Sequence, residues 1–158
     1  MKFTSKGDMI APPSFVFAKM SDFEGWEAAV RKRNTTVTRS PGPIDVGTVW
    51  DTRFRLRGRV RDMKVTLVDV QPERQIHLTI ADPSLNVDIL LDLVALAGDK
   101  SRLVTTIELQ PRNLTARLLI QSLRLARAKI QGQLDQRIHR FAADTTEQYR
   151  VMRQAGVV

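Results

Sequence analysis

The fold is decided by residues 112–150, which read RNLTARLLIQSLRLARAKIQGQLDQRIHRFAADTTEQYR. The stretch contains no proline and a single glycine, Gly132, so it has no strong signal that would end a helix. Its apolar side chains recur at steps of three and four residues, which place them on one face of an α-helix: Leu119, Leu123, Ala126, Ile130, Leu134, Ile138 and Phe141. We therefore predict one long C-terminal helix whose apolar face is covered by the rest of the chain.

The segments before this helix alternate between apolar and polar residues, as antiparallel strands do when one face is buried. In the clearest of them Trp50, Thr52 and Phe54 alternate with Arg53 and Arg55. Similar segments occupy residues 3–10, 63–67, 76–80, 85–93 and 103–109. Most of the connections between them are short turns, which indicates a meander of hairpins and not a parallel sheet.

Two short helices are expected after the first strand. Proline is well tolerated at the start of a helix, so Pro12 and Pro13 favour a helix over residues 14–20. Asp22 can cap a second helix over residues 23–30. Together these elements predict an α+β fold: a curved antiparallel sheet of about seven strands, two short N-terminal helices and one long C-terminal helix enclosing a cavity.

Composition favours one domain spanning residues 1–158. The chain is 42% hydrophobic, enough for one real core, and has no apolar run of membrane-spanning length. Its N-terminus lacks an apolar run of signal-peptide length, so we expect a cytoplasmic location. The absence of cysteine excludes disulfides, thiolate chemistry and cysteine-type zinc sites.

Three local motifs, with this order of elements, resemble the START-like proteins of the SRPBCC superfamily, known for polyketide cyclases and lipid transport. The motifs are IAPPSFVFAKMSDF at residues 10–23, VGTVW at 46–50 and LQP at 109–111. The resemblance covers nearly the whole chain and implies the helix-grip fold, but its motifs match the scaffold and carry no catalytic residue. Lipid carriers, aromatase/cyclases, plant hormone receptors and chaperone activators share that scaffold, so it leaves the chemistry open.

The apolar alternates of the strands, if they point toward the helix, line an internal pocket. The candidate ligand-binding residues are Trp50, Thr52, Phe54, Met63, Val65, Leu78, Ile89, Thr105, Ile130, Leu134 and Arg137. The alternative is a solid core filled by the same side chains. We expect the opening near the turn-rich loop at residues 41–47, which could act as a lid.

Arg137 is the candidate anchor for a polar ligand group. It falls within about 20° of Ile130 on the apolar stripe of the helix. Since an unpaired buried guanidinium is costly, its side chain either reaches the rim or binds an acidic ligand head or a partner carboxylate.

Groups for catalysis are scarce among the inward alternates, which include no Asp, Glu, Lys, Cys or Tyr. The histidines, His77 and His139, are too far apart in sequence for a compact metal motif. We therefore predict no catalytic residue, metal or cofactor, and non-catalytic binding or transport of a hydrophobic small molecule or lipid. A polyketide aromatase/cyclase or dehydratase-like enzyme is the alternative.

The charge of the chain is unevenly distributed. Its formal net charge is +8; residues 31–64 carry ten Lys/Arg and three acids, whereas residues 65–111 carry three and seven. The stripe Arg53, Arg55 and Arg57 is either a solvated face or a peripheral contact with an anionic membrane. Nucleic acid is disfavoured because no aromatic side chain is interleaved on that face. An interaction module using this basic surface is a third alternative.

Overall fold

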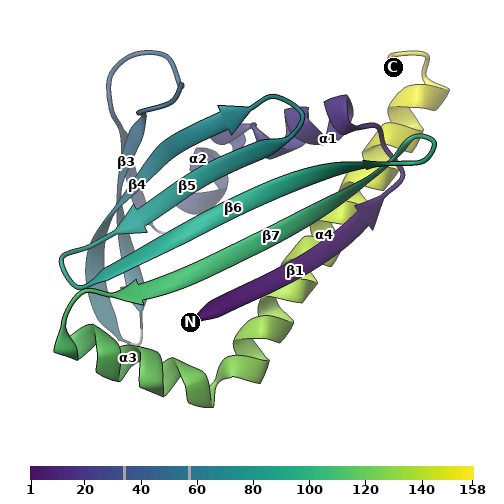
Figure 1. Ribbon diagram of the computed structural model, residues 1–158. Helices are drawn as coiled ribbons and strands as arrows, with labels where there is room; N and C mark the ends of the chain where they lie inside the picture. Colours follow the sequence, from purple (N-terminus) through teal and green to yellow (C-terminus); the bar gives the residue numbers. More distant parts are fainter. Residues whose placement is uncertain (34, 57) are drawn as a thin grey trace.

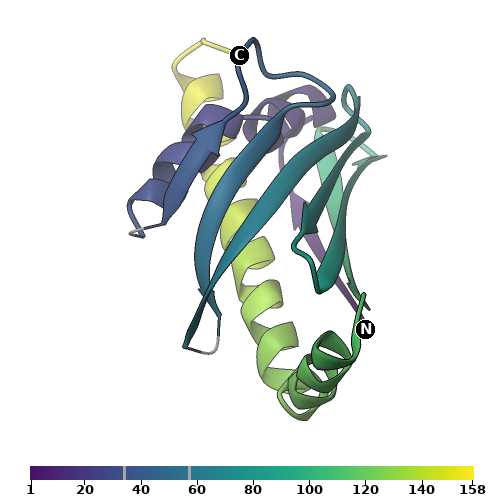
Figure 2. The same cartoon turned by 90° about the vertical axis from the view of Figure 1, so that its left-hand side faces the viewer.

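The computed structural model describes residues 1–33, 35–56 and 58–158, and it shows a curved sheet with helices on its concave side (Figures 1 and 2). Within those residues the sheet has seven antiparallel strands in the order β1-β7-β6-β5-β4-β3-β2. The strands are β1 (Lys2–Met9), β2 (Thr36–Arg39), β3 (Val49–Leu56), β4 (Arg59–Gln71), β5 (Gln75–Ala81), β6 (Leu85–Leu96) and β7 (Lys100–Pro111). The α+β helix-grip fold predicted from the sequence is confirmed. The short edge strand β2 was not identified in the sequence, because four residues carry too little alternation.

Two helices, α1 (Pro13–Met20) and α2 (Phe23–Arg31), connect β1 to β2. α1 starts at the proline pair, and α2 is capped by Asp22, whose Oδ1 accepts a hydrogen bond from the backbone N–H of Gly25 at 3.1 Å. α2 begins at the predicted residue, and α1 begins one residue before the predicted range of 14–20. α2 lies over the half of the sheet that is farther from β1 (Figure 2).

The C-terminal segment forms two helices, α3 (Leu114–Leu125) and α4 (Arg127–Gln154), where one continuous helix was predicted. They meet at Ala126, whose backbone leaves the helical region (φ −101°, ψ 15°). Neither proline nor glycine is present at the break, so packing causes it. Along a straight helix the buried Leu123 and Ile138 would lie about 60° apart. The break lets α3 cover the end of the sheet while α4 runs along β1 (Figure 1).

α4 approaches β1 closely because β1 has a glycine at the contact. A Cβ added to Gly7 would lie 2.9 Å from Cγ2 of Ile138, closer than carbon atoms pack. Polar contacts fix the same register: Ser5 Oγ donates to Asp135 Oδ1 at 2.6 Å, and Gln131 Nε2 donates to the carbonyl oxygen of Thr4 at 2.9 Å. α4 is therefore held over the edge strand of the sheet and not over its middle.

The apolar core is divided into two clusters. The larger one joins α1, α2, the middle of the sheet and α4, and includes Val16, Trp50 and Leu78. The smaller one lies at the end of the sheet, where Ile120 of α3 packs with Met63 and Leu85. No helix in the described residues is both long enough and apolar enough to cross a bilayer.

Candidate functional site

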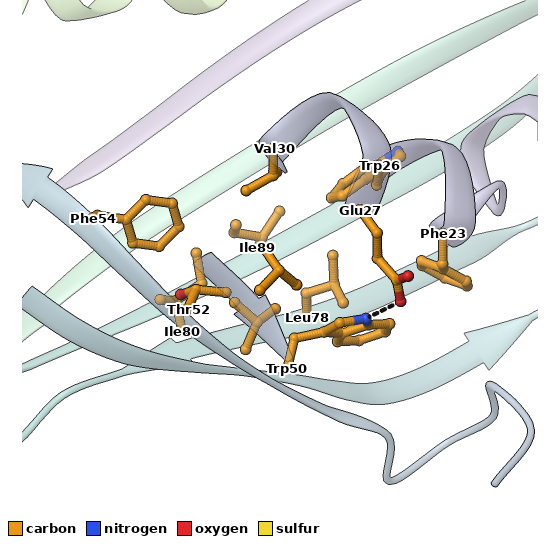
Figure 3. Close-up of a pocket in the computed structure, with 12 residues that line it drawn as sticks. Phe23, Trp26, Glu27, Val30, Trp50, Thr52, Phe54, Leu78, Ile80 and Ile89 are labelled. Carbon is orange, nitrogen blue, oxygen red and sulfur yellow. Dashed lines mark hydrogen bonds between the residues drawn. The ribbon is translucent and has the colours of Figure 1, made fainter. Parts of the chain in front are cut away.

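A half-enclosed pocket of about 150 Å³ lies between α2 and the concave face of the sheet (Figure 3). It is lined by Phe23, Trp26, Glu27, Val30, Val37, Trp50, Thr52, Phe54, Val65, Leu78, Ile80 and Ile89. Apart from one glutamate and one threonine, every one of these side chains is apolar. The surface available to a ligand is therefore largely apolar.

The floor of the pocket follows from the strand register. Trp50 pairs with Val65, and Val65 pairs with Ile80 on the next strand. Leu78 pairs with Ile89. Residues paired across antiparallel strands point to the same face, so these side chains form one continuous apolar floor.

The roof of the pocket comes from α2. Phe23, Trp26, Glu27 and Val30 are spaced at i, i+3, i+4 and i+7, so they share the face of α2 that is turned to the sheet (Figure 3). Trp26 is 44% exposed, while Phe23 is buried against Trp50.

Glu27 ties this roof to the sheet. Its Oε1 accepts a 2.8 Å hydrogen bond from the indole Nε1–H of Trp50 and lies 3.3 Å from a guanidinium nitrogen of Arg39 on β2 (Figure 3). Its Oε2 lies 3.6 Å from Arg31, whose guanidinium also donates to the carbonyl oxygen of Val37 at 3.2 Å. The side chain is only 9% exposed. Sequence reasoning missed Glu27, although its spacing from Phe23 and Val30 was a sufficient signal.

The hydroxyl of Thr52 is also engaged. Its Oγ1 donates to the carbonyl oxygen of Met63 at 3.0 Å. Both polar side chains of the lining thus have partners within the protein, and the rest of the wall is apolar.

Six of the predicted ligand-binding residues meet in this pocket: Trp50, Thr52, Phe54, Val65, Leu78 and Ile89. The structure does not bring the other five to it. Met63 packs in the smaller core cluster, and Thr105 is buried beside β1. Ile130 and Leu134 are half-buried on α4, which covers β1 and leaves the pocket to α2.

Arg137 is exposed on α4 and does not line the pocket. The buried face of α4 runs through Ile138, Ala142 and Thr145, which turns Arg137 outward. Arg137 therefore reaches solvent on α4, away from the rim of this pocket. The predicted lid at residues 41–47 is not among the lining residues, and Gly47 N–H is held by the carbonyl oxygen of Leu67 at 2.8 Å.

One pair of titratable groups lies on the outer face of the sheet. His77 Nε2 lies 3.0 Å from Asp88 Oδ1. In the part of the chain that the structure describes, no three His, Cys, Asp or Glu side chains gather as a metal site.

The predicted basic stripe is partly neutralised. The Arg53 Nε donates to Asp62 Oδ1 at 2.8 Å, and this hydrogen bond raises the pKa of the guanidinium further above its usual value. Lys64 lies 3.8 Å from Asp51. Arg55 is exposed, and Arg57 lies outside the described residues.

Comparisons with known proteins agree with this fold. The family model described as polyketide cyclase / dehydrase and lipid transport matches residues 1–145. No curated protein matches the sequence.

Solved structures with the same fold are distant in sequence. A protein from Thermus thermophilus is 13% identical, with a TM-score of 0.59 over 94% of this chain and 96% of that one. The Zhui aromatase/cyclase from a Streptomyces species is 16% identical, with a TM-score of 0.56 over 72% of this chain and 69% of that one. Truncated norcoclaurine synthase from Thalictrum flavum is 12% identical, with a TM-score of 0.57 over 69% and 74%. At these identities the likeness concerns the fold alone.

Proposed function

Because this chain belongs to the polyketide cyclase/dehydrase and lipid-transport family, we propose that it binds a small hydrophobic molecule in the pocket between α2 and the sheet, without catalysing a reaction on it. The observation that carries the proposal is the wall of the pocket, which is half-enclosed and apolar. Moving an apolar ligand from water into such a site gains about 25 cal/mol per Å² of apolar surface buried.

The volume limits what fits. A dry apolar cavity of about 150 Å³ is known to accept benzene in another protein, and the pocket here has a similar volume. We infer that it holds one ring or a short branched chain, with any larger part of the ligand extending past the exposed Trp26.

The alternative is an enzyme like the aromatase/cyclase among the similar structures. General acid–base catalysis requires a polar group within hydrogen-bond reach of the substrate. The carboxylate of Glu27 is turned to Trp50 and Arg39, and the hydroxyl of Thr52 to a backbone carbonyl. Binding uses the pocket as it stands, whereas catalysis requires one of these groups to exchange its partner.

Filling the pocket tests the proposal. Toluene and naphthalene are titrated calorimetrically into the wild-type protein, into Ile89→Trp and into Leu90→Trp. Ile89 lines the pocket, whereas Leu90 points from the same strand to the other face, so the control adds equal bulk elsewhere. We expect the wild type and Leu90→Trp to bind and Ile89→Trp to lose at least tenfold in affinity. Failure of the wild type to bind either probe, or full binding by Ile89→Trp, would refute the proposal.

The membrane contact predicted through Arg53, Arg55 and Arg57 is a separate proposal. Its support is the exposed position of Arg55, and the ion pair of Arg53 with Asp62 weakens it.

A further inference from the structure

Helix α3 presents a row of leucines to solvent. Leu114, Leu118 and Leu125 are 71%, 58% and 92% exposed. At 100° per residue they lie within about 40° of one another around the helix axis. The opposite side of α3 carries its buried residues, Ala116, Ile120 and Leu123. The leucines therefore point directly away from the protein, although leucine is among the residues most often buried. We call this row, with Arg117 and Arg124, the α3 face.

The α3 face is also strongly basic. Residues 112–134 contain five Lys/Arg and no Asp or Glu. Arg117 and Arg124 are seven residues apart, so they flank the leucine row on one side. Both are exposed, and the ion pairs found in the described part of the chain do not include either.

We propose that the α3 face docks the protein on the surface of an anionic lipid bilayer. A helix with leucines on one face and arginines beside them lies in the plane of the interface: the leucines enter the headgroup and acyl boundary while the guanidinium groups reach lipid phosphates. The absence of acids in residues 112–134 makes the charge of α3 complementary to such a surface. The same charge opposes pairing with a second copy, because the two basic faces would repel.

The position of α3 links this surface to the pocket. On its buried side, Ile120 belongs to the smaller core cluster, and Phe54 and Ile80 pack against that cluster. Phe54 and Ile80 also line the pocket. α3 lies at the end of the molecule where β3 ends and β4 begins (Figures 1 and 2). Docking would place this end of the pocket next to the membrane; this last step alone rests on the proposed binding function.

The test is co-sedimentation of the full chain with vesicles of phosphatidylcholine alone or with about a third phosphatidylglycerol. We expect the wild type to bind the anionic vesicles at least tenfold more tightly than the neutral ones. Arg117→Gln combined with Arg124→Gln should weaken that binding roughly 30-fold, because each arginine near an anionic surface contributes a factor of about five. Leu118→Gln combined with Leu125→Gln should weaken it about tenfold or more.

The matched control removes the same charge elsewhere. Arg137→Gln combined with Arg140→Gln changes two exposed arginines of α4 and should alter binding less than about twofold. Val94→Gln, at an exposed apolar residue of β6, should have no effect.

Three results would overturn the proposal. The first is equal binding to neutral and anionic vesicles, or to neither. The second is wild-type binding by both α3 double variants. The third is a dimer in light scattering that the Leu118/Leu125 variant dissociates, which would assign the face to a second copy. Toluene and naphthalene titrations of the same variants report separately on the pocket, so failure of docking and failure of ligand binding are distinguishable.

Discussion

The two halves of the concave face are covered in opposite ways. Over β1, α4 packs so closely that a single added carbon at Gly7 would collide with Ile138. Over β3 to β6, α2 is kept away from the floor of the sheet and a cavity remains. We call these the closed half and the hollow half.

The difference lies in side-chain size and in how each helix is held. β1 offers Ser5 and Gly7 to α4, whereas β3 offers Trp50 and Phe54 to α2. Small residues let backbones approach, and large ones hold a helix at a distance. α2 is then fixed by the polar contacts of Glu27 as well as by packing. A cavity thus remains where large strand side chains face a helix that is held in place by polar contacts.

The largest predicted effect concerns the closed half. Gly7→Val should lower the free energy of unfolding by roughly 3 kcal/mol, because the new side chain overlaps Ile138 and pushes α4 from β1. Urea denaturation followed by circular dichroism measures this.

Gly132→Ala is the control for that experiment. A Cβ at Gly132 meets nothing within 4 Å, so alanine should raise the stability of the helix by about 0.5–1 kcal/mol. If Gly7→Val leaves the free energy of unfolding unchanged, α4 is not packed tightly against β1 and the closed half does not differ from the hollow half in packing.

The next effect concerns the polar contacts by which Glu27 holds α2 over the hollow half. Glu27→Ala should cost about 2 kcal/mol, because it leaves the buried indole N–H of Trp50 without its acceptor and Arg39 without its partner. Glu27→Gln keeps an acceptor and should cost less. The measurement is urea unfolding with tryptophan fluorescence, and Glu24→Ala on the exposed side of α2 is the control. Equal stability of Glu27→Ala and Glu24→Ala would show that packing alone holds α2.

A third prediction concerns the end of the hollow half, where Asp82 lies before β6. Burial by itself would raise the pKa of Asp82. Hydrogen bonds from the Ser84 N–H, from Arg61 at 2.7 Å and from the Leu85 N–H outweigh burial, so the pKa lies below its usual value. Since the folded protein holds this proton less tightly than the unfolded chain, the group stabilises the fold above the unfolded-state pKa of about 4. That contribution is lost as the pH falls through the lower folded-state pKa.

Asp82→Asn tests whether the pKa of Asp82 is lowered in the folded protein. At about pH 7 the variant should be less stable than the wild type by roughly 1–2 kcal/mol, because Arg61 loses its charged partner. The gap should narrow as the pH falls from about 5 to about 3. Urea unfolding of both proteins at each pH measures the gap, and other carboxylates cancel in the difference. A gap independent of pH would contradict the lowered pKa.

Sequence periodicity was sufficient for the fold and for the floor of the pocket. Strand alternation alone placed Trp50, Val65, Leu78 and Ile89 on one face, since the register of antiparallel strands preserves side-chain direction. Strand alternation did not predict that α2 forms the roof of the pocket. The helical stripe of residues 119–141 suggested that α4 covers the pocket, but the position of α4 depends on the close approach at Gly7.

Two further features depended on tertiary packing. The break at Ala126 has no local signal, because the segment around it consists of good helix formers. The helical spacing of Glu27 from Phe23 and Val30 places it on the inner face of α2, but its partner Trp50 lies 23 residues away in the chain, so the pairing itself follows only from the folded structure.

The smallest effect compares one hydroxyl in each half. In the described part of the chain the buried Oγ1 of Thr105 has no hydrogen-bond partner, whereas Thr52 Oγ1 donates to Met63. Thr105→Val removes an unsatisfied polar atom at nearly constant shape and should leave stability unchanged or raise it by up to about 1 kcal/mol. Thr52→Val removes a satisfied hydrogen bond and should lower stability by about 1 kcal/mol. Urea unfolding of both variants gives the comparison directly. If Thr105→Val lowers the free energy of unfolding as much as Thr52→Val does, the hydroxyl of Thr105 must have a hydrogen-bond partner in the closed half.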